Sequence, residues 1–202
     1  MKVLKFGGSS VGSANAINNV RHIVEGTQGP VIVVVSALGG VTDQLIRLTQ
    51  MAAKGNVGYT TEFNALTERH HQIVADVIKA ERQARLIASL DALLAELHSI
   101  LHGVYLIQDL TPKIADAIVA YGERMSSLIV AELITDAVHF DARRLIRTEH
   151  GSAKHLVDFD KTSQLVIEAF AHDAPRVAVM GGFIASDSET GVTTNLGRGG
   201  SD

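Results

Sequence analysis

The chain has 202 residues, of which 46% are hydrophobic and 20% are charged. These values are typical of a globular domain with a substantial core, and they exclude a disordered chain. The net charge of −4 gives no bulk attraction to nucleic acid, and the absence of cysteine excludes disulfides and thiolate chemistry. No apolar run approaches the roughly 20 residues of a membrane span, and the N-terminus lacks the apolar stretch of a signal peptide. We therefore expect a soluble, cytoplasmic protein that binds neither a membrane nor nucleic acid.

The first part of the chain alternates between strand and helix patterns. Val3–Phe6 is short and apolar-rich, and Val31–Val35 is a continuous β-branched run, which is typical of a strand buried on both faces of a parallel sheet. The pattern predicts a helix over Ala14–Gly26, with Ser13 as its N-cap. Another helix is predicted to begin at Thr42. This order predicts an α/β layered fold with right-handed crossovers.

The middle of the chain, from about Thr61 to Ala137, has an almost entirely helical pattern. We interpret it as a helical insertion in a single domain, and we expect Gly122 to interrupt its last two helical stretches. One helix carries a stripe of apolar side chains formed by Leu86, Leu90, Leu93, Leu97, Ile100 and Leu101. A stripe that faces the core is the simpler interpretation, and a dimer seam is the alternative.

The last part of the chain returns to alternating elements. Ala137–Asp141 has strand character, Asp158–Ala171 is predicted to be a helix, and Ala178–Met180 is predicted to be a third core strand. In open α/β sheets, ligands bind where strands end and helices begin, so the segments at such points are candidate sites.

The first candidate segment runs from Lys5 to Gly12. Lys5 leaves the strand, Gly7 and Gly8 let the backbone approach a ligand, and Ser9 leads toward a helix whose N-terminal amides attract anions. The segment is neither a P-loop nor a G-x-G-x-x-G loop, because it lacks the Gly-Lys-Ser/Thr ending and the second glycine. A tight turn with a surface lysine explains the same residues equally well, since a lone glycine pair is a weak signal.

The second and third candidates are less specific. Ser36 and Thr42 offer hydroxyl groups at the end of the second strand, although Thr42 could simply be an N-cap. Glu123 lies within an apolar helix pair, which suggests a partly buried carboxylate. Such a group needs a cationic partner, which a substrate ammonium could supply. An ordinary solvated glutamate is the alternative.

The fourth segment is the most specific signal in the chain. In Leu196–Asp202 an arginine, Arg198, is framed by three glycines and followed by Ser201 and Asp202. Arginine grips a carboxylate with two parallel hydrogen bonds, and the glycines allow backbone amides to face the same ligand. A purely structural loop rarely needs all of these residues together.

Four motifs, KFGGSSV, SALGGVTD, HGVYLIQDL…YGERMSS and TTNLGRGGSD, together resemble the aspartate kinases of the amino-acid kinase family. The resemblance covers the whole chain in the expected order, and the long helical middle is similar to the longer aspartate kinases, including those fused to homoserine dehydrogenase. It implies a three-layer αβα sandwich with a mainly parallel central sheet. Asn195 departs from the threonine of many family members, and we expect little functional consequence from it.

The resemblance also implies roles for individual residues. Lys5 would contact the transferring phosphoryl group of ATP, with Gly7, Gly8 and Ser9 along the phosphate path. Asp202 would organise the reacting groups and the Mg²⁺-bound nucleotide, and no side chain is expected to bind the metal directly. The residues expected to hold L-aspartate are Ser36, Thr42, Glu123, Arg198 and Ser201.

The activity implied by the resemblance is ATP-dependent phosphorylation of L-aspartate to 4-phospho-L-aspartate, the entry step to lysine, threonine and methionine, in a homo-oligomer. Another amino-acid kinase, or a non-catalytic assembly module that retains the fold, is the alternative. The family pattern continues past Asp202, so the resemblance implies that residues 1–202 are the N-terminal part of a kinase domain, with most of the adenine-binding lobe outside them.

Overall fold

The computed structural model describes residues 1–151, 155–172, 174–197 and 200. The first half contains β1 (Lys2–Phe6), the 3-10 helix η1 (Gly8–Val11), α1 (Ala14–Glu25), β2 (Val31–Val35), α2 (Val41–Ala53), α3 (Tyr59–Val77) and α4 (Ala80–Ile107). The second half contains α5 (Pro112–Val119), α6 (Tyr121–Leu133), β3 (Ala137–His139), η2 (Ala142–Arg144), β4 (Arg147–Thr148), α7 (Phe159–Phe170), β5 (Val177–Gly181), β6 (Ile184–Asp187) and β7 (Thr193–Asn195).

The central sheet has the strand order β1-β2-β5-β3, and all three pairings are parallel. A second, three-stranded sheet, β4-β6-β7, combines one parallel and one antiparallel pairing. The α/β fold with a mainly parallel central sheet is therefore confirmed. Because parallel strands end at the same edge, the loops after β1 and β2 emerge side by side.

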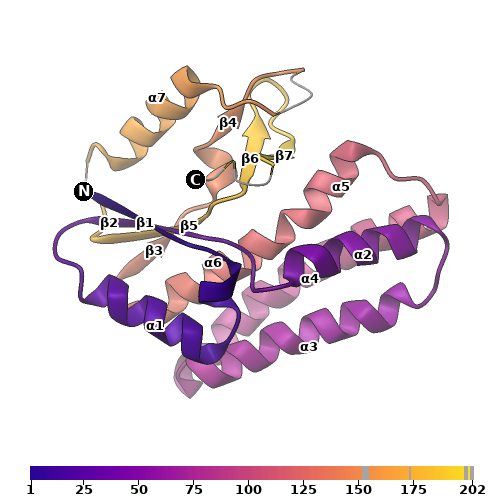
Figure 1. The fold of residues 1–202 in the computed structure, drawn as a ribbon, viewed down its shortest axis with the longest axis horizontal. Coiled ribbons are helices and arrows are strands. Elements are labelled where there is room, and N and C mark those ends of the chain that lie inside the picture. Colours follow the sequence, from indigo (N-terminus) through magenta and orange to yellow (C-terminus); the bar gives the residue numbers. More distant parts are fainter. Residues whose placement is uncertain (152–154, 173, 198–199, 201–202) are drawn as a thin grey trace.

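The central sheet lies between two layers of helices (Figure 1), with α7 on one face and α1 and α6 on the other. Alternate residues of β2 explain this arrangement, because successive side chains of a strand point to opposite faces. Val31, Val33 and Val35 belong to the main core, whereas Ile32 and Val34 pack with the cluster that contains α7. Helices α2 to α5 extend the molecule beyond the sheet on the side of α6.

Helix α4 packs its apolar stripe into this core. Leu86, Leu90, Leu97 and Leu101 are all buried, so the core-facing interpretation is confirmed, with Leu94 buried more deeply than the predicted Leu93. Among the described residues, α4 alone has the length and apolar composition of a membrane-spanning helix. A single helix of this kind is weak evidence for a membrane span, and these leucines pack against the core.

Most predicted elements are present within a few residues of their expected ends, but two positions differ. Helix α2 begins at Val41 rather than at Thr42, because Gly40 occupies the N-cap position with φ +81°. Thr42 therefore lies in the first turn and is not the N-cap. Gly122 does not interrupt the helices, since the break falls at Ala120 and Gly122 lies in the first turn of α6. The second difference arises from tertiary packing, described below.

Candidate functional site

A cavity of about 710 Å³ opens at the carboxyl ends of β1 and β2. Its lining comes from the loops after these strands, from α2, α5 and α6, and from the region of β6 and β7. The structure brings five of the predicted site residues together in this lining, namely Lys5, Gly8, Ser36, Thr42 and Glu123. Residues that are up to 118 positions apart in the chain thus share one cavity.

The other predicted site residues fall into two groups. Gly7 and Ser9 flank Gly8 without lining the cavity, and Ser9 is exposed. Arg198, Ser201 and Asp202 lie outside the described residues. Their predicted roles therefore remain predictions.

The loops after β1 and β2 pack against each other, backbone to backbone. The register pairs Phe6 with Val35, and the Ser36 amide then donates to the Phe6 carbonyl at 3.0 Å. A Cβ on Gly39 would lie 3.1 Å from the Gly8 carbonyl oxygen, and a Cβ on Gly12 would lie 3.2 Å from the same atom. These glycines therefore favour the close approach of the two loops, because a Cβ at either position would be tightly packed against the Gly8 carbonyl.

Arg69, from α3, ties the two loops together. One nitrogen of its guanidinium donates to the Gly39 carbonyl at 2.7 Å and to the Gly12 carbonyl at 3.4 Å. Sequence analysis did not identify Arg69, because a single arginine in a helix carries no signal for carbonyl groups that lie 30 and 57 positions away.

Glu123 is buried, with only 3% of its surface exposed. Its Oε1 accepts a hydrogen bond from the Ala37 amide at 3.1 Å, whereas its buried Oε2 has no partner among the described residues. Burial raises the pKa of Glu123 from 4.5 to about 7, and the Ala37 hydrogen bond only partly offsets this effect. The alternative of a solvated glutamate is wrong, and the site holds a carboxyl group that has no cationic partner among the described residues.

Two glycines make this burial possible. A Cβ on Gly122 would lie 2.7 Å from the Cβ of Ala37, and a Cβ on Gly181 would lie 2.7 Å from the Cβ of Glu123. Both distances are too short for a side chain, so glycine is required for α6 to pack this closely against the loop after β2 and the end of β5. Close packing of α6, rather than the end of a helix, explains why position 122 is a glycine.

Asn195 is a second lining residue with an unsatisfied acceptor. Its Nδ2 donates to the carbonyl and to Oδ1 of Asp116, both at 3.1 Å. Because both partners are acceptors, the amide must present Nδ2 to them, and its Oδ1 is left buried without a partner. The second carboxylate oxygen of Asp116 is 3.1 Å from Nε2 of His155. Sequence analysis treated Asn195 only as a minor departure from a family motif.

The cavity is therefore lined by charges of both signs. Asp43, Asp116 and Glu123 line it as carboxylates, and Lys5 lines it as a cation at the end of β1. Lys5 and the amides of the adjacent loop fit the phosphate groups of a nucleotide, since such loops stabilise anions. Among the residues that the structure describes, there is no group of three side chains that could hold a metal ion. A zwitterion that is cationic at one end and anionic at the other matches this arrangement.

Comparison with known proteins agrees with the geometry. The pattern of the amino acid kinase family matches residues 1–202. The aspartokinase of Chlamydia trachomatis is 31% identical over 99% of this chain and 43% of its own length, and a bifunctional aspartokinase/homoserine dehydrogenase of Arabidopsis thaliana is 27% identical over 99% of the chain and 22% of its own length. Escherichia coli aspartokinase III, solved in complex with aspartate and ADP, superposes with a TM-score of 0.84 at 27% identity, covering all of this chain and 44% of that one.

The chain thus spans about a fifth of the length of the bifunctional plant enzymes and less than half of the bacterial aspartokinases that it matches. The match to the family pattern nevertheless extends from the first residue to the last. The parallel sheet, the paired glycine loops and this match together establish that the chain belongs to the amino acid kinase family.

Proposed function

We propose that the chain carries the acceptor-binding part of an enzyme that transfers a phosphoryl group from ATP to the side-chain carboxylate of L-aspartate, forming 4-phospho-L-aspartate and ADP. The observation that carries the proposal is the buried, unpaired Oε2 of Glu123 in a cavity that Lys5 also lines. Relatives that are named aspartokinases support the choice of substrate.

Glu123 and Asn195 would hold the α-ammonium group of aspartate. Glu123 Oε2 and Asn195 Oδ1 are both buried acceptors without partners, and an ammonium group has three donors. A bound ammonium would also stabilise the ionised form of Glu123 and lower its raised pKa. Ser36 and Thr42 lie in the same lining and offer hydroxyl groups to the carboxylates of the substrate.

Lys5 and the loop that follows it would lie near the reacting groups, which are the transferring phosphoryl group and the side-chain carboxylate of aspartate. Bound MgATP would supply the phosphoryl group and the divalent charge that offsets its oxygens. Lys5 would stabilise the charge that spreads over the transferring phosphoryl group, with Gly7, Gly8 and Ser9 along the phosphate path. The side-chain carboxylate of aspartate is itself the nucleophile, so positioning and charge neutralisation matter more than a general base. Arg198, Ser201 and Asp202 would complete the grip on aspartate and on the nucleotide.

Hydroxylamine trapping with the full-length protein tests this proposal, because it converts an acyl phosphate to a hydroxamate. We expect hydroxamate with aspartate, ATP and Mg²⁺, and none with glutamate. Product with glutamate but not with aspartate would contradict the proposed substrate. An absence of product with every acid would favour a non-catalytic module.

The Glu123→Gln variant tests the residue that carries the proposal. The loss of one charge-assisted contact is expected to raise the KM for aspartate about 10- to 100-fold and to leave the KM for ATP unchanged. Glu68→Gln, at an exposed position of α3, removes the same charge elsewhere and should change neither constant. An unchanged KM for aspartate in Glu123→Gln would exclude Glu123 as the ammonium partner.

Homo-oligomeric assembly, a cytoplasmic location and a place in lysine, threonine and methionine synthesis stay predictions.

A further inference from the structure

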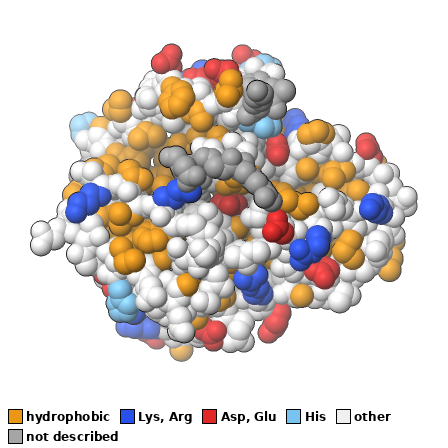
Figure 2. Space-filling model, in the orientation of Figure 1, with side chains coloured by type: hydrophobic (Ala, Val, Ile, Leu, Met, Phe, Trp, Pro, Cys, Tyr) orange, Lys and Arg blue, Asp and Glu red, His pale blue; other side chains and the backbone are white. Residues whose placement is uncertain are grey.

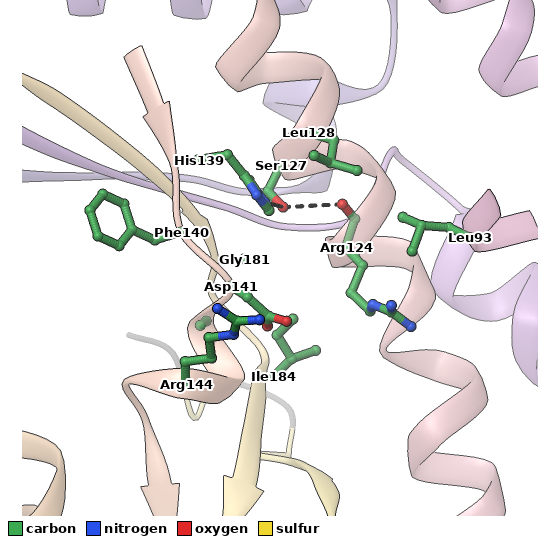
Figure 3. A pocket seen from close by; sticks show the side chains of 11 residues that line it. Leu93, Arg124, Ser127, Leu128, His139, Phe140, Asp141, Arg144, Gly181 and Ile184 are labelled. Carbon is green, nitrogen blue, oxygen red and sulfur yellow. Dashed lines mark hydrogen bonds between the residues drawn. The ribbon is translucent and has the colours of Figure 1, made fainter. Parts of the chain in front are cut away.

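A second cavity, of about 310 Å³, lies against α6 and shares no lining residue with the first (Figure 3). Its polar lining includes Arg124 and Ser127 from α6, His139 from the end of β3, and Asp141 and Arg144 from the segment that follows. Figure 3 shows Arg124 reaching into the pocket from α6 and Arg144 from η2.

Arginine side chains give this cavity a positive charge. Arg124 is only 15% exposed and pairs with Glu96 through one contact of 3.2 Å, and the same Glu96 oxygen also accepts the Tyr121 hydroxyl. The guanidinium of Arg124 is stacked on the Tyr121 ring at 4.3 Å. A guanidinium has five N–H donors, so Arg124 retains donors for another acceptor.

The carboxylate in the lining does not cancel this charge. Asp141 is gripped by the Arg143 side chain, with contacts of 2.9 Å from Nε and 2.6 Å from Nη2, and Arg143 and Arg124 hold the pKa of Asp141 below its usual range. Arg144 is exposed and lines the cavity. Of the charged side chains that line the cavity, Arg124 and Arg144 are positive and Asp141 is negative, so one positive charge remains uncompensated in the lining.

The remaining lining combines a neutral polar pair with an apolar wall. The Ser127 hydroxyl is 2.9 Å from Nε2 of His139, and burial lowers the pKa of His139, so the ring is neutral near pH 7. Apolar side chains complete the wall, namely Leu93 of α4, Leu128 of α6 and Ile184 of β6. The cavity therefore offers donors and positive charge to an anionic group and apolar contact to a short organic body.

We propose that this cavity is a binding site for a small organic anion, with a carboxylate or phosphate head between Arg124 and Arg144 and a short apolar body against the leucine and isoleucine side chains. The uncompensated charge selects an anion, and the apolar wall favours an anion with a carbon skeleton over a free inorganic ion. The site is separate from the cavity that contains Glu123, and the proposal does not depend on the activity proposed above.

The test uses three probes, benzoate, phenyl phosphate and inorganic phosphate, titrated into the protein with histidines labelled at the ring carbon. We expect saturable binding of at least one organic anion, with a shift of the His139 ring resonance, and weaker binding of inorganic phosphate. A preference for benzoate would identify a carboxylate head, and a preference for phenyl phosphate a phosphate ester. An absence of saturable binding by both organic probes would overturn the proposal.

The matched variants are Arg144→Gln and Arg85→Gln. Arg144 is exposed, so its replacement should leave the fold intact while weakening the binding of the organic anion about tenfold, the loss of one charge-assisted hydrogen bond. Arg85 is an exposed arginine of α4 that does not line the cavity, and its replacement should change the affinity less than twofold, as general charge screening predicts. Equal weakening by both variants would show that binding is non-specific and would overturn the proposal.

Discussion

Two consecutive residues of α6, Glu123 and Arg124, line two cavities of opposite chemical character. Successive helical residues point about 100° apart, so neighbours in sequence can face different surroundings. Glu123 faces a cavity where two buried acceptors lack partners, and Arg124 faces a cavity where donors exceed acceptors. Adjacent residues of one helical turn can therefore place a carboxyl group in one cavity and a guanidinium group in the other.

The two residues also differ in how well the protein satisfies them. Arg124 has a carboxylate and an aromatic ring as partners, whereas Glu123 has a single backbone amide and a raised pKa. Burying a carboxylate with an unpaired oxygen destabilises the folded state, because no group replaces its lost hydration. Such a residue is expected where a ligand, rather than the protein, provides the missing partner.

The largest expected effect concerns pH. The folded protein holds the proton on Glu123 up to about pH 7, whereas the unfolded chain releases it near the ordinary value of 4.5. Glu123 therefore imposes no cost below pH 4.5, and the free energy of unfolding falls as the pH rises from 4.5 to 7, on the order of 3 kcal/mol in total. Urea unfolding of the unliganded protein between pH 4 and 8 measures this fall.

Glu123→Gln is the control for this measurement, because glutamine keeps an acceptor for the Ala37 amide and cannot ionise. We expect the difference in unfolding free energy between variant and parent to grow with pH over this window and then to level off. Hydrogen bonds from Thr190, His150 and Glu189 lower the pKa of Asp187 below its ordinary value of 3.8. Asp187 therefore loses its stabilising contribution only when the pH falls below that value, which is outside the pH window of Glu123. Parallel pH profiles of the two proteins would show that Glu123 is not buried as described.

A smaller effect is expected from the glycine that brings α6 to the first cavity. In Gly122→Ala, the new Cβ would lie 2.7 Å from the Cβ of Ala37, so α6 or the loop after β2 must move. Overpacking of this kind destabilises a protein by about 1–3 kcal/mol. Thermal or urea unfolding measures this loss.

Gly103→Ala provides the matched control, because Gly103 lies within α4 and a Cβ there would meet no atom within 4 Å. The same substitution is expected to stabilise the protein by about 0.5–1 kcal/mol, through the better helix propensity of alanine. If both variants were stabilised, the close approach of α6 to Ala37 would be incorrect.

The smallest expected effect is at Asn195. Asn195→Thr removes the amide that donates twice to Asp116 and the Oδ1 acceptor in the cavity. We expect aspartate binding to weaken about tenfold, from the loss of about one hydrogen bond to a charged group. Calorimetric titration with aspartate measures this change, and Asn64→Thr on the exposed surface of α3 should leave binding unchanged. Unchanged binding in Asn195→Thr would support the expectation from sequence that this position matters little.

Local patterns predicted the strands of the central sheet well, whereas β4, β6 and β7 of the second sheet were not predicted. Val31–Val35 forms β2 with the predicted bounds, and Ser13 caps α1 by accepting from the Ala16 amide at 3.3 Å. Both features depend on residues that are close in sequence. On the face shown in Figure 2, lysine and arginine side chains are interspersed with acidic and apolar ones.

Features that depend on distant partners were missed or misread. Gly122 was interpreted as a helix break, but glycine is required there because a side chain would clash with the Cβ of Ala37, which lies 85 positions away in the chain. Arg69 looked like any helical arginine, and Asn195 acquires its partner only when α5 packs beside β7. No local pattern encodes such contacts, because each depends on the way in which two elements meet.

The sequence by itself determined the α/β class, the order of the main strands and the positions of the glycine-rich loops, since periodicity and chain-reversing residues act over a few positions. Only the tertiary structure decided that the loops after β1 and β2 interlock, that Glu123 is buried with an unpaired oxygen, and that Arg124 serves a separate cavity. The physical reason is that burial, pKa and charge balance are set by atoms from elements far apart in the chain, which come together only when the core is packed.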